Sequence, residues 1–276
     1  MALLGVKLAV SLPDTVLEEK DSPREKTAKL GVIARACAIY GVDLVEVFRD
    51  RGGRGEGALV RRVLEYLETP QYLRRRLFPI EEALRYAGAL PPLRIPSHKP
   101  KVPVASLKVG EVREGVANGD GTVDVGLEAS PRIDASVSRD RRITVKVVSV
   151  SPFVVRQIPR EEAGGYWGYT VEEKSADGVL EDQRFKVKVA TSRLGAPLGE
   201  VLSPLKAKVG SADSVKLVFG SPMRGLYDVF GKDLPKRVDF VVNLFPGQKV
   251  ETVRTEEAVF AALGVVTVVC AEVLGS

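Results

Sequence analysis

The sequence contains few of the residues on which metal sites and disulfide frameworks depend. Among its 276 residues are two cysteines, Cys37 and Cys270, and one histidine. This set is too small for a zinc site or a framework of disulfides, so we expect no metal. Each cysteine lies in an apolar run, which favours a buried thiol, and the low cysteine content fits a reducing cytoplasm.

Long hydrophobic runs are also absent. The longest, residues 258–271, is too short to span a bilayer. It contains Gly264, and we expect a helix to end there and a buried strand to follow over residues 264–270. The first ten residues, MALLGVKLAV, lack the basic start of a signal peptide. We therefore expect a cytoplasmic protein without a membrane partner.

The basic charge, by contrast, is concentrated in one segment. The chain carries a net charge of +5, and residues 49–101 hold 12 Lys and Arg against 6 Asp and Glu. The rest of the chain has 29 basic and 30 acidic residues, so this segment supplies the whole excess. Such a segment is either a solvated surface or a contact for a polyanion such as nucleic acid.

Most of the chain has α/β character. Strands at 6–11 and 43–48 alternate with helices at 22–40 and 58–67, which predicts a parallel sheet. The pattern continues with predicted strands at 168–172, 185–190, 214–219 and 238–243 and a helix at 255–263.

The middle of the chain has a different character. Residues 90–103 hold five prolines without periodicity, as in a linker. Short β-type runs follow at 110–117, 121–127, 133–137 and 143–150. Five short strands in about 70 residues suit a small OB-like β-barrel. We therefore expect a barrel at residues 95–163, inserted into an α/β domain formed by residues 1–94 and 164–276.

A glycine-rich turn at residues 52–57 follows the second predicted strand. The pattern G-x-G-x-x-A at residues 53–58 matches a dinucleotide-binding fingerprint, but no strand ending in an acid follows at the usual distance. Arg51 and Arg54 crowd the turn, which favours a mobile loop that touches RNA phosphate. The pattern G-x-x-x-x-G-K-[ST] occurs nowhere in the chain, which excludes P-loop chemistry.

A second arginine-rich segment, residues 69–80, reads TPQYLRRRLFPI. It combines aromatic side chains with Arg74, Arg75 and Arg76, which is the composition of a nucleic-acid contact. A turn with solvated arginines is the alternative.

Three loops rich in Gly, Ser, Pro and Asn each follow directly after a predicted strand. They lie at 191–195 (TSRLG), 220–226 (GSPMRGL) and 243–248 (NLFPGQ), and the last continues at 251–256 (ETVRTE). Ligands of open parallel sheets bind at the carboxyl ends of the strands. The loops therefore predict a site that offers backbone N–H and C=O groups to a purine edge and a carboxylate.

These blocks together resemble one family of enzymes. Residues 69–80, 84–88 (LRYAG), 90–93 (LPPL), 220–222, 243–248 and 251–258 (ETVRTEEA) are similar to the archaeal and eukaryotic group of SPOUT, or α/β-knot, RNA methyltransferases. The resemblance implies an α/β fold with a SPOUT-type parallel sheet, a C-terminal trefoil knot and an inserted OB-like RNA-binding barrel. It also implies a homodimer that uses S-adenosyl-L-methionine to methylate uridine N3 in structured RNA such as rRNA.

Carried over by position, the resemblance implies a cofactor site in the three loops. The residues that would line it are Thr191, Gly220, Ser221, Pro222, Asn243, Leu244, Gly247, Thr252 and Val253. Arg193 and Arg254 are candidates for stabilising charge on the base, and Glu256 is a candidate for accepting its N3 proton. The alternative is a non-catalytic RNA-binding or assembly factor with a vestigial cofactor site.

Overall fold

The chain forms two compact units, each made of segments that are separated in the sequence. A computed structural model describes residues 5–20, 22–50, 52 and 54–274. The first unit comprises Met1–Glu65, Tyr86–Pro91 and Tyr169–Ser276, and the second comprises Tyr66–Arg85 and Pro92–Gly168. The arginine-rich segment at 69–80 therefore belongs to the same unit as the middle of the chain.

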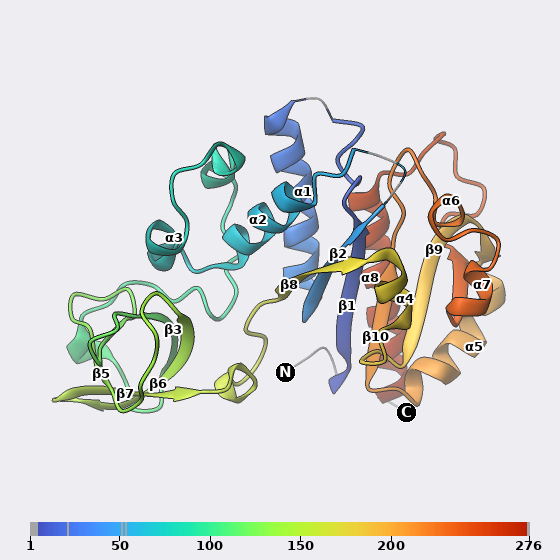
Figure 1. Ribbon diagram of the computed structural model, residues 1–276. Helices are drawn as coiled ribbons and strands as arrows, with labels where there is room; N and C mark the ends of the chain where they lie inside the picture. Colours follow the sequence, from blue (N-terminus) through green and yellow to red (C-terminus); the bar gives the residue numbers. More distant parts are fainter. Residues whose placement is uncertain (1–4, 21, 51, 53, 275–276) are drawn as a thin grey trace. The chain divides into compact units, whose positions relative to one another are not determined.

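The first unit is built on a six-stranded sheet in which every pair of neighbours is parallel, as predicted (Figure 1). Its strands, in the order β11-β9-β10-β1-β2-β8, are β11 (Phe240–Asn243), β9 (Val187–Pro197), β10 (Ser214–Val218), β1 (Lys7–Pro13), β2 (Leu44–Arg49) and β8 (Thr170–Ser175). The helices are α1 (Pro23–Ile39), α2 (Gly57–Glu68, whose last three residues belong to the second unit), α4 (Ala176–Glu181), α5 (Leu198–Gly210), α6 (Leu226–Phe230), α7 (Leu234–Arg237) and α8 (Thr255–Leu274). The central strands β1 and β10 are almost entirely buried, as parallel strands covered on both faces must be.

Each face of this sheet has its own helical cover. Phe48, Ala190 and Val218 from the strands pack with Leu226 of α6 and Leu234 of α7 on one face. On the other face α8 packs against both α1 and α5. Because the two faces are closed by helices, ligands have access mainly at the edge where the strands end.

The C-terminal helix differs from the prediction. We expected a helix that ends at Gly264 and then a strand, whereas α8 continues without a break to Leu274. Val266, Val269 and Cys270 are buried at helical spacing, so the apolar run is one face of a long helix. A Cβ at Gly264 would lie 3.4 Å from the Tyr40 hydroxyl, which is an ordinary van der Waals distance, so this contact does not require glycine.

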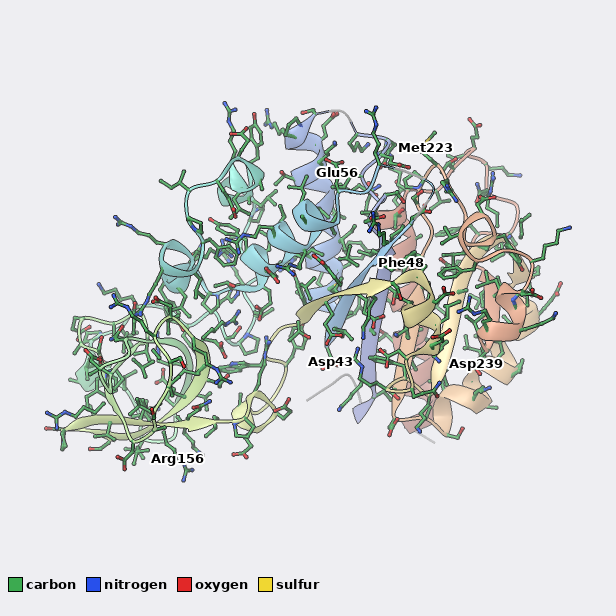
Figure 2. The ribbon with its side chains drawn as sticks, viewed as in Figure 1. Asp43, Phe48, Glu56, Arg156, Met223 and Asp239 are labelled. Atoms are coloured by element: carbon green, nitrogen blue, oxygen red, sulfur yellow. The ribbon has the colours of Figure 1, made fainter. Side chains whose placement is uncertain are left out.

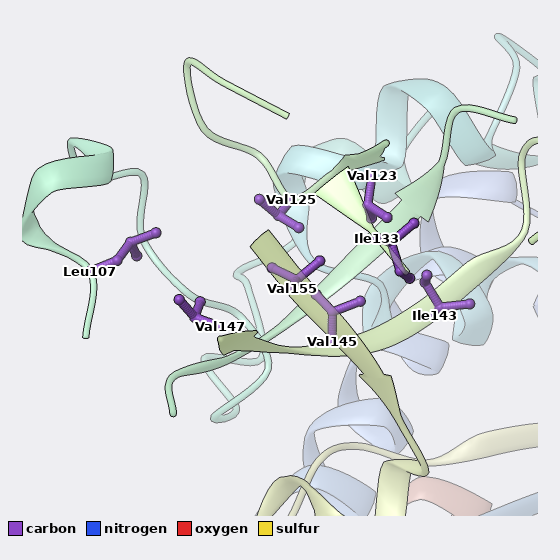
Figure 3. Packing of buried hydrophobic residues seen from close by; sticks show 8 residues of the cluster. All are labelled: Leu107, Val123, Val125, Ile133, Ile143, Val145, Val147 and Val155. Carbon is purple, nitrogen blue, oxygen red and sulfur yellow. The ribbon is translucent and has the colours of Figure 1, made fainter. Parts of the chain in front are cut away.

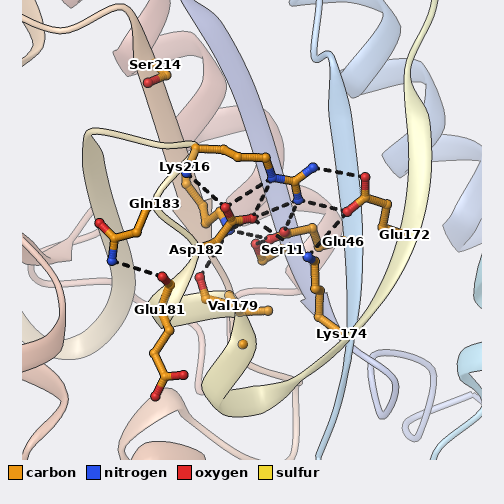
Figure 4. A network of polar contacts seen from close by, with 12 residues as sticks. Ser11, Glu46, Glu172, Lys174, Val179, Glu181, Asp182, Gln183, Ser214 and Lys216 are labelled. Atoms are coloured by element: carbon orange, nitrogen blue, oxygen red, sulfur yellow. Dashed lines mark hydrogen bonds and ion pairs between the residues drawn. The ribbon is translucent and has the colours of Figure 1, made fainter.

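A buried ionic cluster lies on the α4 side of the sheet (Figure 4). Lys216 Nζ of β10 lies 2.7 Å from Glu46 Oε2 of β2 and 3.3 Å from Asp182 Oδ2. Lys216 also donates to the Val179 carbonyl at 3.1 Å, and the Ser11 hydroxyl donates to Glu46 at 2.7 Å. The side chains of Lys216 and Glu46 are both fully buried, so the pair is desolvated and must be satisfied internally.

The second unit contains a five-stranded, nearly closed barrel-like sheet. Its strands, in the order β4-β3-β6-β7-β5, are β4 (Val123–Asp124), β3 (Val112–Ala117), β6 (Arg142–Val150), β7 (Phe153–Ile158) and β5 (Arg132–Ile133). An isolated bridge between Thr122 and Arg132 links the two ends of the sheet. The runs expected at 110–117, 121–127 and 143–150 match β3, β4 and β6, whereas the run expected at 133–137 overlaps β5 only at Ile133, and β7 lies outside all four.

The barrel-like sheet encloses an apolar core (Figure 3). Val123, Ile143, Val145 and Val155 are among its buried side chains, and Ile143, Val145 and Val147 occupy alternate positions of β6, on the same face of the strand. The unit also contains α3 (Gln71–Leu77), and short 3-10 helices lie at Glu82–Leu84, Ala87–Ala89, Val104–Ser106 and Arg160–Ala163. Residues 90–103 contain no helix or strand, as the prolines predicted.

Buried ion pairs connect the segment Tyr66–Arg85 to the barrel-like sheet of the same unit. Arg142 of β6 lies 2.6 Å from Glu68 and 2.7 Å from Glu114, and Arg160 also pairs with Glu68. Both glutamate side chains are almost fully buried. Truncating Arg142 would leave two buried carboxylates poorly compensated, so this arginine fixes the segment in place.

Candidate active site

A pocket of about 240 Å³ lies at the ends of β10 and β11 and beside the second half of β9. It is lined from three segments, at 191–194, 219–228 and 242–258. We call it the three-loop pocket. Met223 from the middle segment lies at the carboxyl edge of the sheet, whereas Asp43 and Asp239, which precede β2 and β11, lie at the opposite edge (Figure 2). The loops thus meet where a parallel sheet positions a ligand site.

The first segment is a bulge inside β9. Pairing with β11 passes from Ala190 directly to Ala196, so residues 191–195 project out of the ladder. Asn243 Nδ2 donates to the Arg193 carbonyl at 3.1 Å and holds the bulge against the end of β11. A Cβ at Gly195 would lie 2.6 Å from the Val241 carbonyl oxygen, so only glycine permits this approach.

The second segment closes on itself through backbone groups. Ser221 N donates to the Arg224 carbonyl at 2.9 Å, and Arg224 N donates to the Ser221 hydroxyl at 3.0 Å. A Cβ at Gly220 would lie 2.8 Å from that same carbonyl oxygen. The loop's own closure therefore already requires glycine at position 220, before any ligand is considered.

The third segment is a turn stabilised by its side-chain amides. Phe245 N donates to Asn243 Oδ1 at 2.9 Å, and Gln248 Nε2 donates to the carbonyls of Val250 and Glu251 at 2.9 and 3.1 Å. Arg193 Nη1 donates to the Glu251 carbonyl at 3.2 Å, which ties the first and third segments together.

The structure brings together most of the residues expected to hold a cofactor. Those that line the three-loop pocket are Thr191, Gly220, Ser221, Pro222, Asn243, Leu244, Thr252 and Val253. Gly247 is not among the lining residues, and its positive φ of 72° assigns it to the turn instead. Asp228 and Gln248 also line the pocket, although sequence reasoning missed them. The sequence signal for Asp228 is an acidic residue three positions after Gly225, which is the spacing of a side chain that caps the start of a helix. Asp228 caps α6 in this way.

The three candidate catalytic residues are placed differently from one another. Arg193 lines the pocket. Arg254 and Glu256 do not line it. Arg254 is exposed, and its backbone N–H donates to Glu257 at the start of α8. The Glu256 side chain is largely buried and lies 3.2 Å from Lys29 Nζ of α1, so it is engaged in an internal ion pair.

The arginines expected to contact RNA are not all available for a ligand. Arg51 lies outside the described residues. Arg54 is exposed, and its backbone N–H donates to Glu18 at 2.8 Å. Arg74 is buried, where its guanidinium donates to the carbonyls of Thr69 and Leu67 at 2.8 and 3.0 Å.

Arg75 and Arg76, the other two arginines of the triplet, differ in exposure and in their partners. Arg76 pairs with Asp140 at 2.9 Å and donates to the Ala117 carbonyl at 2.8 Å, so it fastens α3 to the sheet. Arg75 is exposed. Within the triplet, Arg75 is therefore the side chain best placed for a polyanion, since Arg74 and Arg76 serve the unit's own structure.

Cys37 and Cys270 are free and buried, as predicted, and burial raises the pKa of Cys37 to about 12. Among the described residues, no group of three His, Cys, Asp or Glu side chains is arranged to hold a metal ion. In the same part of the chain, no helix has the length and apolarity needed to cross a membrane.

Comparison with known proteins identifies the class. A family model described as "Putative RNA methyltransferase" matches residues 7–266. Because the match covers most of the chain, the protein belongs to this family of RNA methyltransferases and is an enzyme.

Individual relatives are similar over almost the whole chain. An uncharacterized protein of Halobacterium salinarum is 34% identical over 290 residues, covering 94% of this chain and 98% of its own. The 28S rRNA (uridine-N(3))-methyltransferase of Homo sapiens is 32% identical over 300 residues, covering 93% of this chain and 76% of its own. The Drosophila melanogaster protein of the same name is 30% identical over 299 residues, covering 93% and 61%.

Proposed function

We propose that the protein is an S-adenosylmethionine-dependent methyltransferase that methylates uridine N3 in ribosomal RNA. The observation that carries the proposal is the three-loop pocket, where three segments far apart in the sequence meet at the carboxyl edge of a parallel sheet. The relatives named as uridine-N3 methyltransferases of 28S rRNA support the choice of substrate and atom.

The lining of the pocket fits S-adenosylmethionine chemically. Leu244 and Val253 offer apolar surface to a purine ring, and Ser221 and Thr252 offer hydroxyl groups. The carboxylate of Asp228 suits the positively charged amino group of the ligand. When bound, the cofactor supplies a methyl group already activated by its sulfonium.

The chain's own task is then to position the base and to manage one proton. Loss of the N3 proton spreads negative charge onto the ring oxygens of uracil, and Arg193 in the pocket lining is suited to stabilise that charge. Arg254 remains a second candidate for this role, because it is exposed next to the lining residues. We do not assign proton transfer to Glu256, because its carboxylate is paired with Lys29.

The substrate must present an unpaired uridine. In a duplex, uridine N3 is hydrogen-bonded and hidden, so the target base must lie in a single-stranded region or be flipped out. We assign RNA binding to the barrel-like second unit, with Arg75 as one phosphate contact, and Arg54 of the first unit as another. Both side chains are exposed, which supports the assignment.

We extend the proposal to a C-terminal trefoil knot and a homodimer, which the family resemblance implies. Several apolar residues near the C-terminal helix, including Val259, Leu263 and Leu205, belong to the subunit's own core and are not free for such a contact. Leu194 and Val268 remain 76% and 56% exposed, which supports a smaller apolar contact. Light scattering of the folded protein should give a dimer, and the 29.9 kDa monomer mass at micromolar concentration would contradict it.

Calorimetry with S-adenosylhomocysteine separates the enzyme from the alternative of a non-catalytic assembly factor. We expect micromolar binding that is lost when the three-loop pocket is altered. If the folded protein binds no S-adenosylhomocysteine, the proposed activity fails and the RNA-binding alternative is favoured.

A further inference from the structure

The first unit contains a second and larger pocket at the same edge of its sheet. It has a volume of about 920 Å³ and lies where β1, β2 and β8 end, with Asp14, Arg49 and Lys174 among its lining residues. We call it the Asp14 pocket. Because β1 and β10 are neighbours in a parallel sheet, the Asp14 pocket adjoins the three-loop pocket along the carboxyl edge. Its volume is within the range of about 300–1,000 Å³ that is usual for ligand sites.

One loop of the three-loop pocket is linked to the Asp14 pocket by an ion pair. Gly220, Ser221 and Gly225 line the three-loop pocket, whereas the Arg224 side chain reaches toward the Asp14 pocket, with Nε 3.4 Å from Asp50 Oδ2. Figure 2 shows Met223 of this loop and Glu56 of the glycine-rich turn at the same edge of the sheet. A ligand in the Asp14 pocket would therefore lie beside the cofactor site.

The two aspartates of this pocket have different roles. Asp50 is used by the protein itself, since it accepts from Gly52 N at 3.0 Å and from the Thr15 hydroxyl at 3.2 Å, and pairs with Arg224. Asp14 Oδ1 accepts from Asp50 N at 2.9 Å, but within the described part of the chain no group donates to its Oδ2. Burial raises the pKa of Asp14, so its charged form would gain from a donor supplied by a ligand.

The glycine-rich turn encloses this carboxylate. Glu56 N donates to the Asp14 carbonyl at 2.9 Å, and a Cβ at Gly55 would collide with the Asp14 carboxylate. A Cβ at Gly57 would lie 3.2 Å from Asp14 Cβ. Gly53 of the dinucleotide-like pattern lies outside the described residues. The close approach of Gly55 to Asp14 Oδ2 therefore accounts for that glycine without a bound dinucleotide.

The pocket combines this hydrogen-bond acceptor with positive charge. Arg49 at the end of β2 is exposed, and no ion pair engages it in the described ranges. Lys174 lies 3.5 Å from Glu172 and is therefore already partly neutralised. A ligand suited to this arrangement has an N–H donor at one end and a phosphate at the other, and a uridine nucleotide has both groups.

We propose that the Asp14 pocket holds the acceptor nucleotide of the RNA, with Asp14 accepting a hydrogen bond from uracil N3–H and Arg49 facing the phosphate. The inference rests on the proposed function and adds the residue that recognises the base. A carboxylate at this point selects uracil over cytosine, because N3 of cytosine carries a lone pair where uracil carries a hydrogen.

The test uses free nucleotides and a change that conserves shape. Uridine and cytidine 5′-monophosphates are titrated into the full chain while methyl NMR signals of Val47, Ala58 and Ala176 report on the pocket. We expect the wild type to prefer the uridine nucleotide by about tenfold, the size of one hydrogen bond to a charged group. Asp14→Asn should abolish or reverse the preference, because the amide can donate to cytosine N3. Glu173→Gln removes the same charge from the same pocket and should leave the preference unchanged.

Two results would overturn the inference. One is the absence of shifts at the pocket methyls with either nucleotide, and the other is a uridine preference that persists in Asp14→Asn. In both cases, binding of S-adenosylhomocysteine and methylation of RNA are measured on the same preparation. If these remain intact, the proposed function holds and the acceptor base binds elsewhere. Thermal unfolding checks that Asp14→Asn is folded, which is expected because asparagine can still accept from Asp50 N.

Discussion

Replacing Lys216 by methionine tests the buried ionic cluster of the sheet. Methionine keeps most of the side-chain volume but removes the charge that lies 2.7 Å from Glu46 Oε2. Glu46 would retain the hydrogen bond from Ser11 at 2.7 Å and the more distant Arg184 at 3.4 Å. The carboxylate is fully buried, so water cannot replace the lost ammonium group.

The expected loss of stability follows from this geometry. Removing one partner of a buried ion pair destabilises a protein by about 3–5 kcal/mol, and the remaining partners of Glu46 favour the lower end, about 3 kcal/mol. Burial already raises the pKa of Glu46 above its ordinary value, and loss of Lys216 should raise it further. A carboxyl whose pKa is raised by folding destabilises the fold as pH increases through that pKa. The penalty of Lys216→Met should therefore shrink as pH falls from 7 toward 5.

Urea unfolding at pH 7 and pH 5 measures both effects. Lys208→Met is the matched control, because Lys208 pairs with Asp239 at the surface and is 48% exposed, so its loss should change the free energy of unfolding by less than about 1 kcal/mol. Adding Glu46→Gln to Lys216→Met should recover part of the loss. A penalty below about 1 kcal/mol for Lys216→Met, or one that does not depend on pH, would refute the electrostatic reasoning.

Three further predictions concern the other parts of the molecule. Gly220→Ala should weaken S-adenosylhomocysteine binding at least about tenfold in calorimetry, because the new Cβ forces the Arg224 carbonyl to move; unchanged affinity would remove the loop from the site. Arg75→Gln should lower the slope of log RNA affinity against log salt by about 0.7–0.9, as for one phosphate contact, whereas Arg76→Gln should mainly lower the melting temperature; equal salt slopes in wild type and Arg75→Gln would contradict this. Cys37 should resist alkylation by iodoacetamide at pH 8 in the folded protein and react in urea, because burial raises its pKa to about 12; rapid reaction of the folded protein would show that the thiol is accessible.

The parallel sheet and the three loops could be predicted because their signals are local. Buried strands appear as apolar runs, and each loop begins where such a run ends. The extent of α8 could not be predicted, because Gly264 is a usual helix stop and the burial of Val266, Val269 and Cys270 along one helix face depends on the tertiary structure. The role of Gly220 could not be predicted either, because the group closest to its missing side chain is the Arg224 carbonyl of its own loop rather than a ligand.

Charged residues were harder to assign than glycines. The sequence shows three consecutive arginines, but it does not show that Arg76 meets Asp140 or that Arg74 is buried. Glu256 was a reasonable proton acceptor until the structure placed it beside Lys29. Ion pairs form between residues that are far apart in the sequence. The role of a charged side chain therefore depends on contacts that the periodicity of the sequence does not reveal.

The central claim is tested most directly by the identity of the methylated nucleoside. The purified protein is incubated with S-adenosylmethionine carrying a labelled methyl group and with ribosomal RNA that lacks base methylation, and the RNA is digested to nucleosides. We expect the label to appear in N3-methyluridine, and Arg193→Ala to lower the yield while S-adenosylhomocysteine still binds. Label in a different nucleoside, or no labelled nucleoside from a protein that binds S-adenosylhomocysteine, would contradict it.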